Sequence, residues 1–99
     1  MIPALTWHKG RDRQGRVCYI LRSPTYPKHH FSPISPDDRL GGCSWWGPRR
    51  YRAWFNIGYD DIREEGATAN AAIRRLEKVL HARSIGIFGC DDISFVREE

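Results

Sequence analysis

The chain lacks the features of a membrane or secreted protein. No apolar run approaches the ~18 residues that a membrane span requires. The start, residues 1–9, has no basic segment followed by an apolar stretch, and so does not look like a secretory signal. Cysteine is scarce: Cys18, Cys43 and Cys90 are odd in number and widely spaced, which is a poor disulfide framework. These absences predict a soluble, cytoplasmic protein with reduced cysteines and no membrane partner.

The common catalytic signatures are also missing. The sequence contains no G-x-x-x-x-G-K-[ST], G-x-S-x-G, H-E-x-x-H or G-x-G-x-x-G motif. Their absence argues against a nucleotide-dependent enzyme or a classical hydrolase. We therefore predict a non-catalytic protein, with no catalytic residue, no cofactor and no evident small-molecule substrate.

What is present is a globular composition with an uneven charge. A chain of 99 residues, 40% hydrophobic and 12% aromatic, fits a single domain over residues 1–99. The net charge is +4, but residues 1–58 hold ten bases and three acids (+7), whereas residues 59–99 hold six bases and nine acids (−3). The basic half favours an anionic partner. The competing interpretation is an arginine-rich solvated surface.

The N-terminal half predicts strands around a long loop. Residues 6–9 and 17–21 form a hairpin whose tip carries Arg11 and Arg13, with Gly15 supplying a positive φ. Five of the six prolines fall in residues 23–50, which predicts a long loop, with a possible short strand at residues 43–46. The clearest strand is 50–58, with Tyr51, Ala53, Phe55 and Ile57 on one face and Arg50, Arg52, Trp54 and Asn56 on the other.

The C-terminal half predicts one main helix, residues 67–83. Its apolar residues recur at helical spacing, and Thr68 suits the N-cap. Residues 59–66 form an acidic connector before it, and residues 85–88 and 93–96 form two short strands after it. The fold class is α+β: a small two-layer domain with an antiparallel sheet of four to five strands on one main helix. We expect Cys18 to be a small buried hydrophobe, and the core to comprise Val17, Tyr19, Leu21, Tyr51, Ala53, Phe55, Ile57, Ile73, Leu76, Leu80, Ile87 and Phe95.

Strands followed by a helix that begins Ala-Thr-Ala-Asn-Ala-Ala, residues 67–72, resemble the three-strand-plus-helix DNA-binding domains of some integrases. The eight-residue connector 59–66 interrupts that pattern, so no residue role is transferred from it.

Arginine and tryptophan mark the candidate binding surface. Arginine forks suit phosphates, tryptophan offers a stacking surface, and a sheet face that interleaves the two is typical of single-stranded nucleic-acid binding. The same residue types dominate protein–protein hot spots. This binding surface would not exist if the 23–50 loop folded over the face, or if the tryptophans were part of the core. The predicted binding residues are Arg11, Arg13, Trp45, Trp46, Arg49, Arg50, Arg52, Trp54 and Asn56.

Two other groups of residues are candidates for chemistry. Lys28-His29-His30 could supply acid/base catalysis or metal ligands, but no further ligand lies at a suitable spacing, so no metal site is predicted. The pairs Asp37-Asp38, Asp60-Asp61 and Asp91-Asp92 fall in predicted turns or connectors, where aspartate is common for structural reasons.

Three functions follow from these residues. The first is a non-catalytic binding protein acting on nucleic acid or on a nucleic-acid-handling protein complex. The second is a phage or mobile-element inhibitor of a host defence complex, anti-CRISPR-like, working by protein–protein contact. The third is a small basic ribonuclease or toxin that uses His29 or His30. An exposed strand at a sheet edge could also pair with a second copy, so an oligomer is possible.

Overall fold

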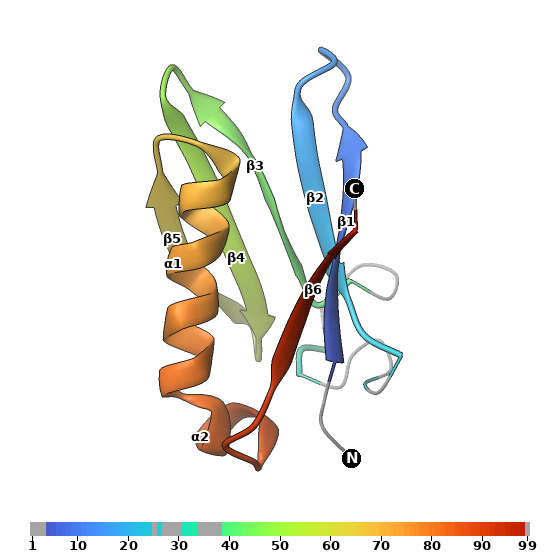
Figure 1. Ribbon diagram of the computed structural model, residues 1–99, viewed down its shortest axis with the longest axis vertical. Helices are drawn as coiled ribbons and strands as arrows, with labels where there is room; N and C mark the ends of the chain where they lie inside the picture. The colour runs from blue at the N-terminus through green and yellow to red at the C-terminus, as the bar shows by residue number, and fades with distance from the viewer. Residues whose placement is uncertain (1–3, 25, 27–30, 34–38, 99) are drawn as a thin grey trace.

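The computed structural model describes residues 4–24, 26, 31–33 and 39–98. In chain order its elements are β1 (Ala4–Arg11), β2 (Val17–Arg22), β3 (Gly41–Gly47), β4 (Arg50–Ile57), β5 (Asp60–Gly66), α1 (Ala69–Ala82), α2 (Ser84–Phe88) and β6 (Ser94–Glu98). The strands form one six-stranded sheet in the order β5-β4-β3-β2-β1-β6, and α1 lies across one face of it (Figure 1). The α+β class and the single main helix are confirmed. Among the described residues, no helix is long and apolar enough to cross a bilayer.

The sheet differs from the prediction in strand number and in direction. It has six strands rather than four or five, and β6 pairs with β1 in parallel, in register from Ala4↔Ser94 to His8↔Glu98. The reason is the path of the chain after β5. Helix α1 returns the chain along the sheet, so that the next strand starts at the end where β1 starts (Figure 1). A helical crossover of this kind delivers parallel strands, which local alternation cannot reveal.

Two segments adopt a different secondary structure from the predicted one. Most of the predicted connector 59–66 forms strand β5 (Asp60–Gly66), which pairs antiparallel with β4 along its whole length. Residues 85–88, predicted as a strand, lie in the short helix α2, which ends at Gly89 in the left-handed conformation (φ 76°). A four-residue apolar run does not distinguish a strand from a helix, and the left-handed glycine is a typical helix stop.

The other predicted elements are confirmed, with shifted ends. The first hairpin closes on Asp12, whose side chain accepts hydrogen bonds of 2.9 Å from the backbone N–H groups of Gln14 and Arg16. Strand β3 extends the segment 43–46 at both ends, and it shortens the predicted 23–50 loop. Thr68 caps α1 by accepting a 3.1 Å bond from the Ala71 N–H.

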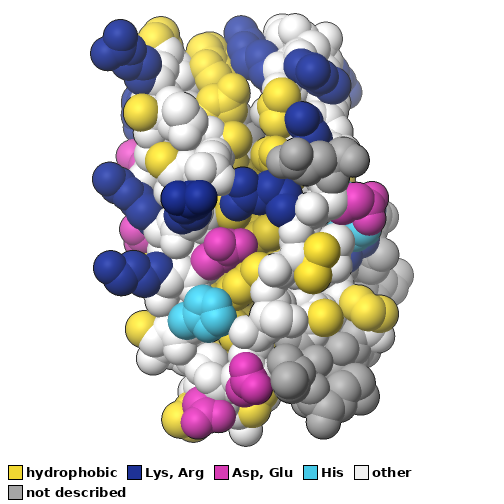
Figure 2. Space-filling view, viewed as in Figure 1, with side chains coloured by type: hydrophobic (Ala, Val, Ile, Leu, Met, Phe, Trp, Pro, Cys, Tyr) yellow, Lys and Arg dark blue, Asp and Glu magenta, His cyan; other side chains and the backbone are white. Residues whose placement is uncertain are grey.

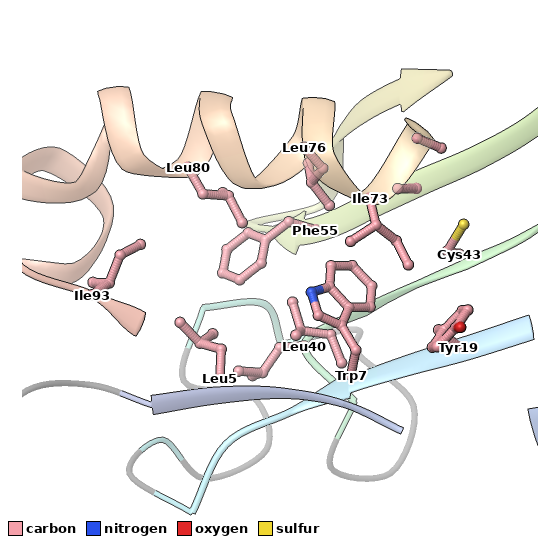
Figure 3. Close-up of a cluster of buried hydrophobic side chains, with 13 residues drawn as sticks. Leu5, Trp7, Tyr19, Leu40, Cys43, Phe55, Ile73, Leu76, Leu80 and Ile93 are labelled. Carbon is pink, nitrogen blue, oxygen red and sulfur yellow. The ribbon is translucent and has the colours of Figure 1, made fainter. Parts of the chain in front are cut away.

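The core lies between α1 and the inner face of the sheet, the face toward the helix (Figure 3). The predicted core residues Tyr19, Leu21, Ala53, Phe55, Ile73, Leu76 and Leu80 are buried. The predicted residues Val17, Tyr51, Ile57, Ile87 and Phe95 are half-buried at its margin. The core also contains residues that were not predicted: Leu5, Trp7, Leu40, Cys43, Ala72 and Ile93. Cys18 is half-buried rather than buried, because it alternates with Tyr19 and lies on the opposite, outer face.

The described part of the 23–40 segment closes one end of this core. Phe31 packs on Phe55 with ring centroids 5.2 Å apart, and on Phe88 of α2 at the same distance. Ser32 donates a hydrogen bond to the Gly58 carbonyl, and the Gly58 N–H donates to the Phe31 carbonyl at 2.7 Å. Phe31 and Ser32, the described residues of this segment that make these contacts, therefore pack beside the inner face and not on the outer face.

Candidate functional site

The outer face of β3, β4 and β5 carries the most distinctive group of side chains. Six residues line a shallow depression of about 320 Å³, and we call this surface the platform: Ser44, Trp46, Arg52, Trp54, Asp61 and Arg63. Helix α1 lies on the other side of these strands (Figure 1). The indole of Trp46 is 52% exposed, whereas the inner-facing neighbours Cys43, Ala53 and Phe55 are buried. The platform is thus an accessible surface of aromatic and charged groups.

Strand register brings these residues together. Ser44 pairs with Arg52 across β3–β4, and Trp54 pairs with Arg63 across β4–β5. Gly42 opposes Trp54, and a Cβ on Gly42 would lie 2.9 Å from Cζ2 of the Trp54 indole. The glycine therefore lets the Trp54 ring lie close against strand β3, where it forms the floor of the platform.

Arg52 connects the aromatic and the charged parts of the platform. Its guanidinium carbon lies 4.0 Å from the centroid of the Trp46 ring, within the range of a cation–π interaction. The same guanidinium donates to Glu65 Oε1 at 3.1 Å, and Arg50 donates to that oxygen at 2.9 Å. These two hydrogen bonds hold the pKa of Glu65 below its ordinary value.

A second ion pair lies at the other side of the platform. Arg63 Nε is 2.9 Å from Asp61 Oδ1, both on β5. The arginines of the platform are thus partly neutralised by acids of the strand that the sequence predicted as a connector. Asp61, Arg63 and Glu65 stand two residues apart along β5, and this i, i+2 spacing of charged residues on one face was the signal that could have revealed the strand.

The sheet forks at one end of the molecule. Strands β2 and β3 pair over three residues, from Leu21↔Gly41 to Tyr19↔Cys43, and beyond that the hairpins β1–β2 and β3–β4 diverge (Figure 1). Arg16 bridges the opening, with its guanidinium carbon 3.7 Å from the centroid of the Trp45 ring. We call this region the forked end: Arg11, Arg13, Arg16, Trp45, Arg49 and Arg50.

Backbone geometry is unusual at the tip of the second hairpin. Arg49 has φ 54° and is the one non-glycine residue with a positive φ in the described part of the chain. Such a conformation costs about 1 kcal/mol or more in a residue with a Cβ. The strained residue thus lies in the turn between β3 and β4, which presents two adjacent arginines, Arg49 and Arg50.

On the face shown in Figure 2, charge is distributed unevenly along the long direction of the sheet. Lys and Arg side chains occupy the upper part of Figure 2, toward the hairpin tips, and acidic side chains dominate its lower end. The topology accounts for this: both arginine-bearing tips point one way, while the β4–β5 turn with Asp60 and the α2–β6 connection with Asp91 and Asp92 lie at the other end (Figure 1). On this face the positive charge therefore lies toward the hairpin tips, where it attracts anions.

The structure divides the nine predicted binding residues among different surfaces. Trp46, Arg52 and Trp54 share the platform, and Asn56 lies further along the same face of β4, opposite Asp61. Trp45 lies on the inner face, because it alternates with Trp46 and pairs with Tyr51. Arg11 and Arg13 lie at the first hairpin tip, and Arg49 and Arg50 at the second. Sequence reasoning missed Arg16, Ser44, Asp61, Arg63 and Glu65.

The other chemical candidates add no site within the described residues. Lys28, His29 and His30 and the pair Asp37-Asp38 lie outside them. Among the side chains that are described, no group of three or more His, Cys, Asp or Glu gathers closely enough to hold a metal ion. Burial raises the pKa of the Cys43 thiol to about 12, which keeps it protonated and unreactive at neutral pH.

Comparison with protein families, with curated proteins and with solved structures finds no match. The resemblance to the integrase domains is one of element order alone. Strands β3, β4 and β5 followed by α1 do form three consecutive antiparallel strands and a helix, because the supposed connector is a strand.

Proposed function

We propose that this protein is a non-catalytic module that binds single-stranded nucleic acid on the platform. The observation that carries the proposal is the pairing of two tryptophans with two arginines on a sheet face that no described helix covers. Single strands present unstacked bases, which proteins recognise by stacking on aromatic side chains and guanidinium planes. Each stacked base contributes about 1–3 kcal/mol.

The residues of the platform have distinct proposed roles. Trp46 is the base-stacking ring, because it is the exposed one. Trp54 supports the depression from below, since it lies against Gly42. Arg52 and Arg63 lie beside the two indoles and would contact backbone phosphates. The forked end adds long-range attraction, because it extends the positive charge beyond the edge of the platform.

A protein partner is the competing proposal, and the exposed hydrophobic residues do not favour it. Within the part of the chain that the structure describes, the large exposed ones are Trp46 on β3, Tyr59 in the β4–β5 turn, Ile85 on α2 and Val96 on β6. Apolar residues scattered singly are normal on a protein surface and do not mark an interface. An inhibitor of a nucleoprotein complex, anti-CRISPR-like, is therefore kept as an outcome of the test below.

The test is fluorescence anisotropy of labelled single-stranded DNA and RNA, and of the matching duplexes, at rising salt. The variant Trp46→Ala/Arg63→Gln removes one exposed indole and one arginine from the platform. The matched control, Ile85→Ala/Arg83→Gln, removes one exposed hydrophobic side chain and one exposed arginine at the α1–α2 junction, away from the platform strands (Figure 1).

We expect salt-sensitive binding of single strands by the wild type, about tenfold or more weaker in the platform variant and little changed in the control. An equal loss in both variants would contradict the placement of the site. No binding by the folded wild type at low salt would refute the function, and affinity purification would then seek a protein target.

A further inference from the structure

Arg50 and Arg52 converge on a single oxygen atom. They are two residues apart on β4, so their side chains leave the strand on the same face. The Nη2 atom of Arg50 is 2.9 Å from Glu65 Oε1, and the Nη2 atom of Arg52 is 3.1 Å from the same oxygen. Two guanidinium groups around one anionic oxygen is a geometry that also suits a phosphate oxygen.

The contact is open to the solvent. The side chains of Arg50 and Glu65 are 55% and 44% exposed, and that of Arg52 is 21% exposed because the Trp46 ring lies against it. Exposed ion pairs contribute little to stability, so a competing anion can separate them. Arg75 donates a 3.0 Å hydrogen bond to the Glu65 carbonyl, so the backbone at this residue has a contact that does not depend on the carboxylate.

We infer that Arg50 and Arg52 form a phosphate-binding site that Glu65 occupies in the free protein. A backbone phosphate of a bound single strand takes the place of the Glu65 carboxylate, beside the Trp46 ring. This inference rests on the proposed function. It adds that the chain carries its own competitor for the nucleic acid, so that binding is weaker than the arginine content alone would give.

Protonation does not open this site at neutral pH. The hydrogen bonds from Arg50 and Arg52 lower the pKa of Glu65, so the carboxylate stays ionised down to a lower pH than an ordinary glutamate. Displacement by a stronger or multivalent anion is therefore the route by which the two arginines become available.

Glu65→Gln is the test variant, and the neighbouring Glu64 provides its control. Both substitutions raise the net charge by one, but Glu64 lies on the other face of β5, opposite Ala53. In anisotropy with single-stranded DNA at low salt, we expect E65Q to bind about threefold or more tightly than E64Q. The slope of log affinity against log salt should steepen by about 0.7 for each arginine that moves onto a phosphate. Adding Arg50→Gln and Arg52→Gln to E65Q should abolish the gain. Equal affinities and slopes for E65Q and E64Q would overturn the inference.

A second readout separates this inference from the proposed function. Inorganic phosphate is titrated into each variant while the side-chain Nε–H signals of Arg50 and Arg52 are followed by NMR. Shifts in E65Q that are larger than those in E64Q support the anion site, even if no nucleic acid binds and the proposed function fails. If nucleic acid binds but phosphate moves these signals equally in both variants, and E65Q gains no affinity, the anion site fails while the proposed function stands.

Discussion

A hydrogen bond between the core and the helix gives a prediction that can be worked out in detail. The indole of Trp7 is fully buried in the centre of the core (Figure 3). Its Nε1–H donates to Glu77 Oε2 on α1 at 3.0 Å. This bond connects β1, near one edge of the sheet, to a helix that packs mainly on β3, β4 and β5.

The expected free energies follow from the burial of the ring. Glu77→Ala leaves a buried donor without its acceptor, which costs about 1–3 kcal/mol. Glu77→Gln keeps an acceptor and should cost less than Glu77→Ala. Trp7→Phe removes the donor together with part of a core side chain, and it should cost about 2–3 kcal/mol. In the Trp7→Phe background the indole N–H is absent, so Glu77→Ala no longer leaves a buried donor without an acceptor. The double variant should therefore be more stable than the sum of the single losses predicts, by about 1–2 kcal/mol.

Urea unfolding followed by circular dichroism measures each free energy of unfolding. Trp7→Phe combined with Lys78→Ala serves as the control pair, because Lys78 is exposed and should add independently. A coupling energy between Trp7 and Glu77 below about 0.3 kcal/mol, within the usual error of additivity, would refute the reasoning.

Two further predictions concern the inner face of the sheet. Burial raises the pKa of the Cys43 thiol from an ordinary value of 9.0 to about 12. Between these two pH values the unfolded chain loses the thiol proton and the native state keeps it. The free energy of unfolding that this group supports is therefore fully present below pH 9 and is lost as the pH rises from 9 to 12. Unfolding of Cys43→Ala, compared with the wild type across this range, should show a smaller decline with pH, and an identical decline would contradict the assignment. A methyl group on Gly41 would lie 2.0 Å from the Trp54 carbonyl oxygen, so Gly41→Ala should destabilise by about 3 kcal/mol or more, whereas Gly15→Ala, with open space but φ 79°, should cost about 1 kcal/mol in the same urea assay. If the two glycine variants lost the same free energy of unfolding, the close approach of β3 to β4 at Gly41 would not be what excludes a side chain there.

Local patterns predicted the parts of the molecule that depend on neighbouring residues. The alternation along residues 50–57 placed Ala53 and Phe55 in the core and Arg52 and Trp54 on the outer face, as the strand register shows. The helical spacing of residues 69–80 likewise predicted the packed face of α1. In both cases the spacing of the apolar residues matches the period of the strand or the helix that they form.

Features that depend on distant pairing were missed. Strand β5 has an acidic composition that disfavours strands, and it forms because it pairs with β4 along its whole length. The parallel position of β6 depends on the crossover through α1, and Cys43 is buried because β3 lies in the middle of the sheet. The candidate site was therefore predicted in part: Trp46, Arg52 and Trp54 of β3 and β4 were named, whereas Ser44 of β3 and the β5 residues Asp61 and Arg63 were not.

The four tryptophans allow the central claim, that single-stranded nucleic acid lies on the platform, to be tested in one measurement. Trp7 is buried in the core, Trp45 lies at the forked end, and Trp46 and Trp54 line the platform. Titrating unlabelled single-stranded DNA into ¹⁵N-labelled protein should shift the indole N–H signals of Trp46 and Trp54 in a saturable manner and leave that of Trp7 unchanged. The claim would be contradicted if DNA bound while the Trp46 and Trp54 signals stayed in place. It would equally be contradicted if these signals did not move at the highest DNA concentration reached at low salt.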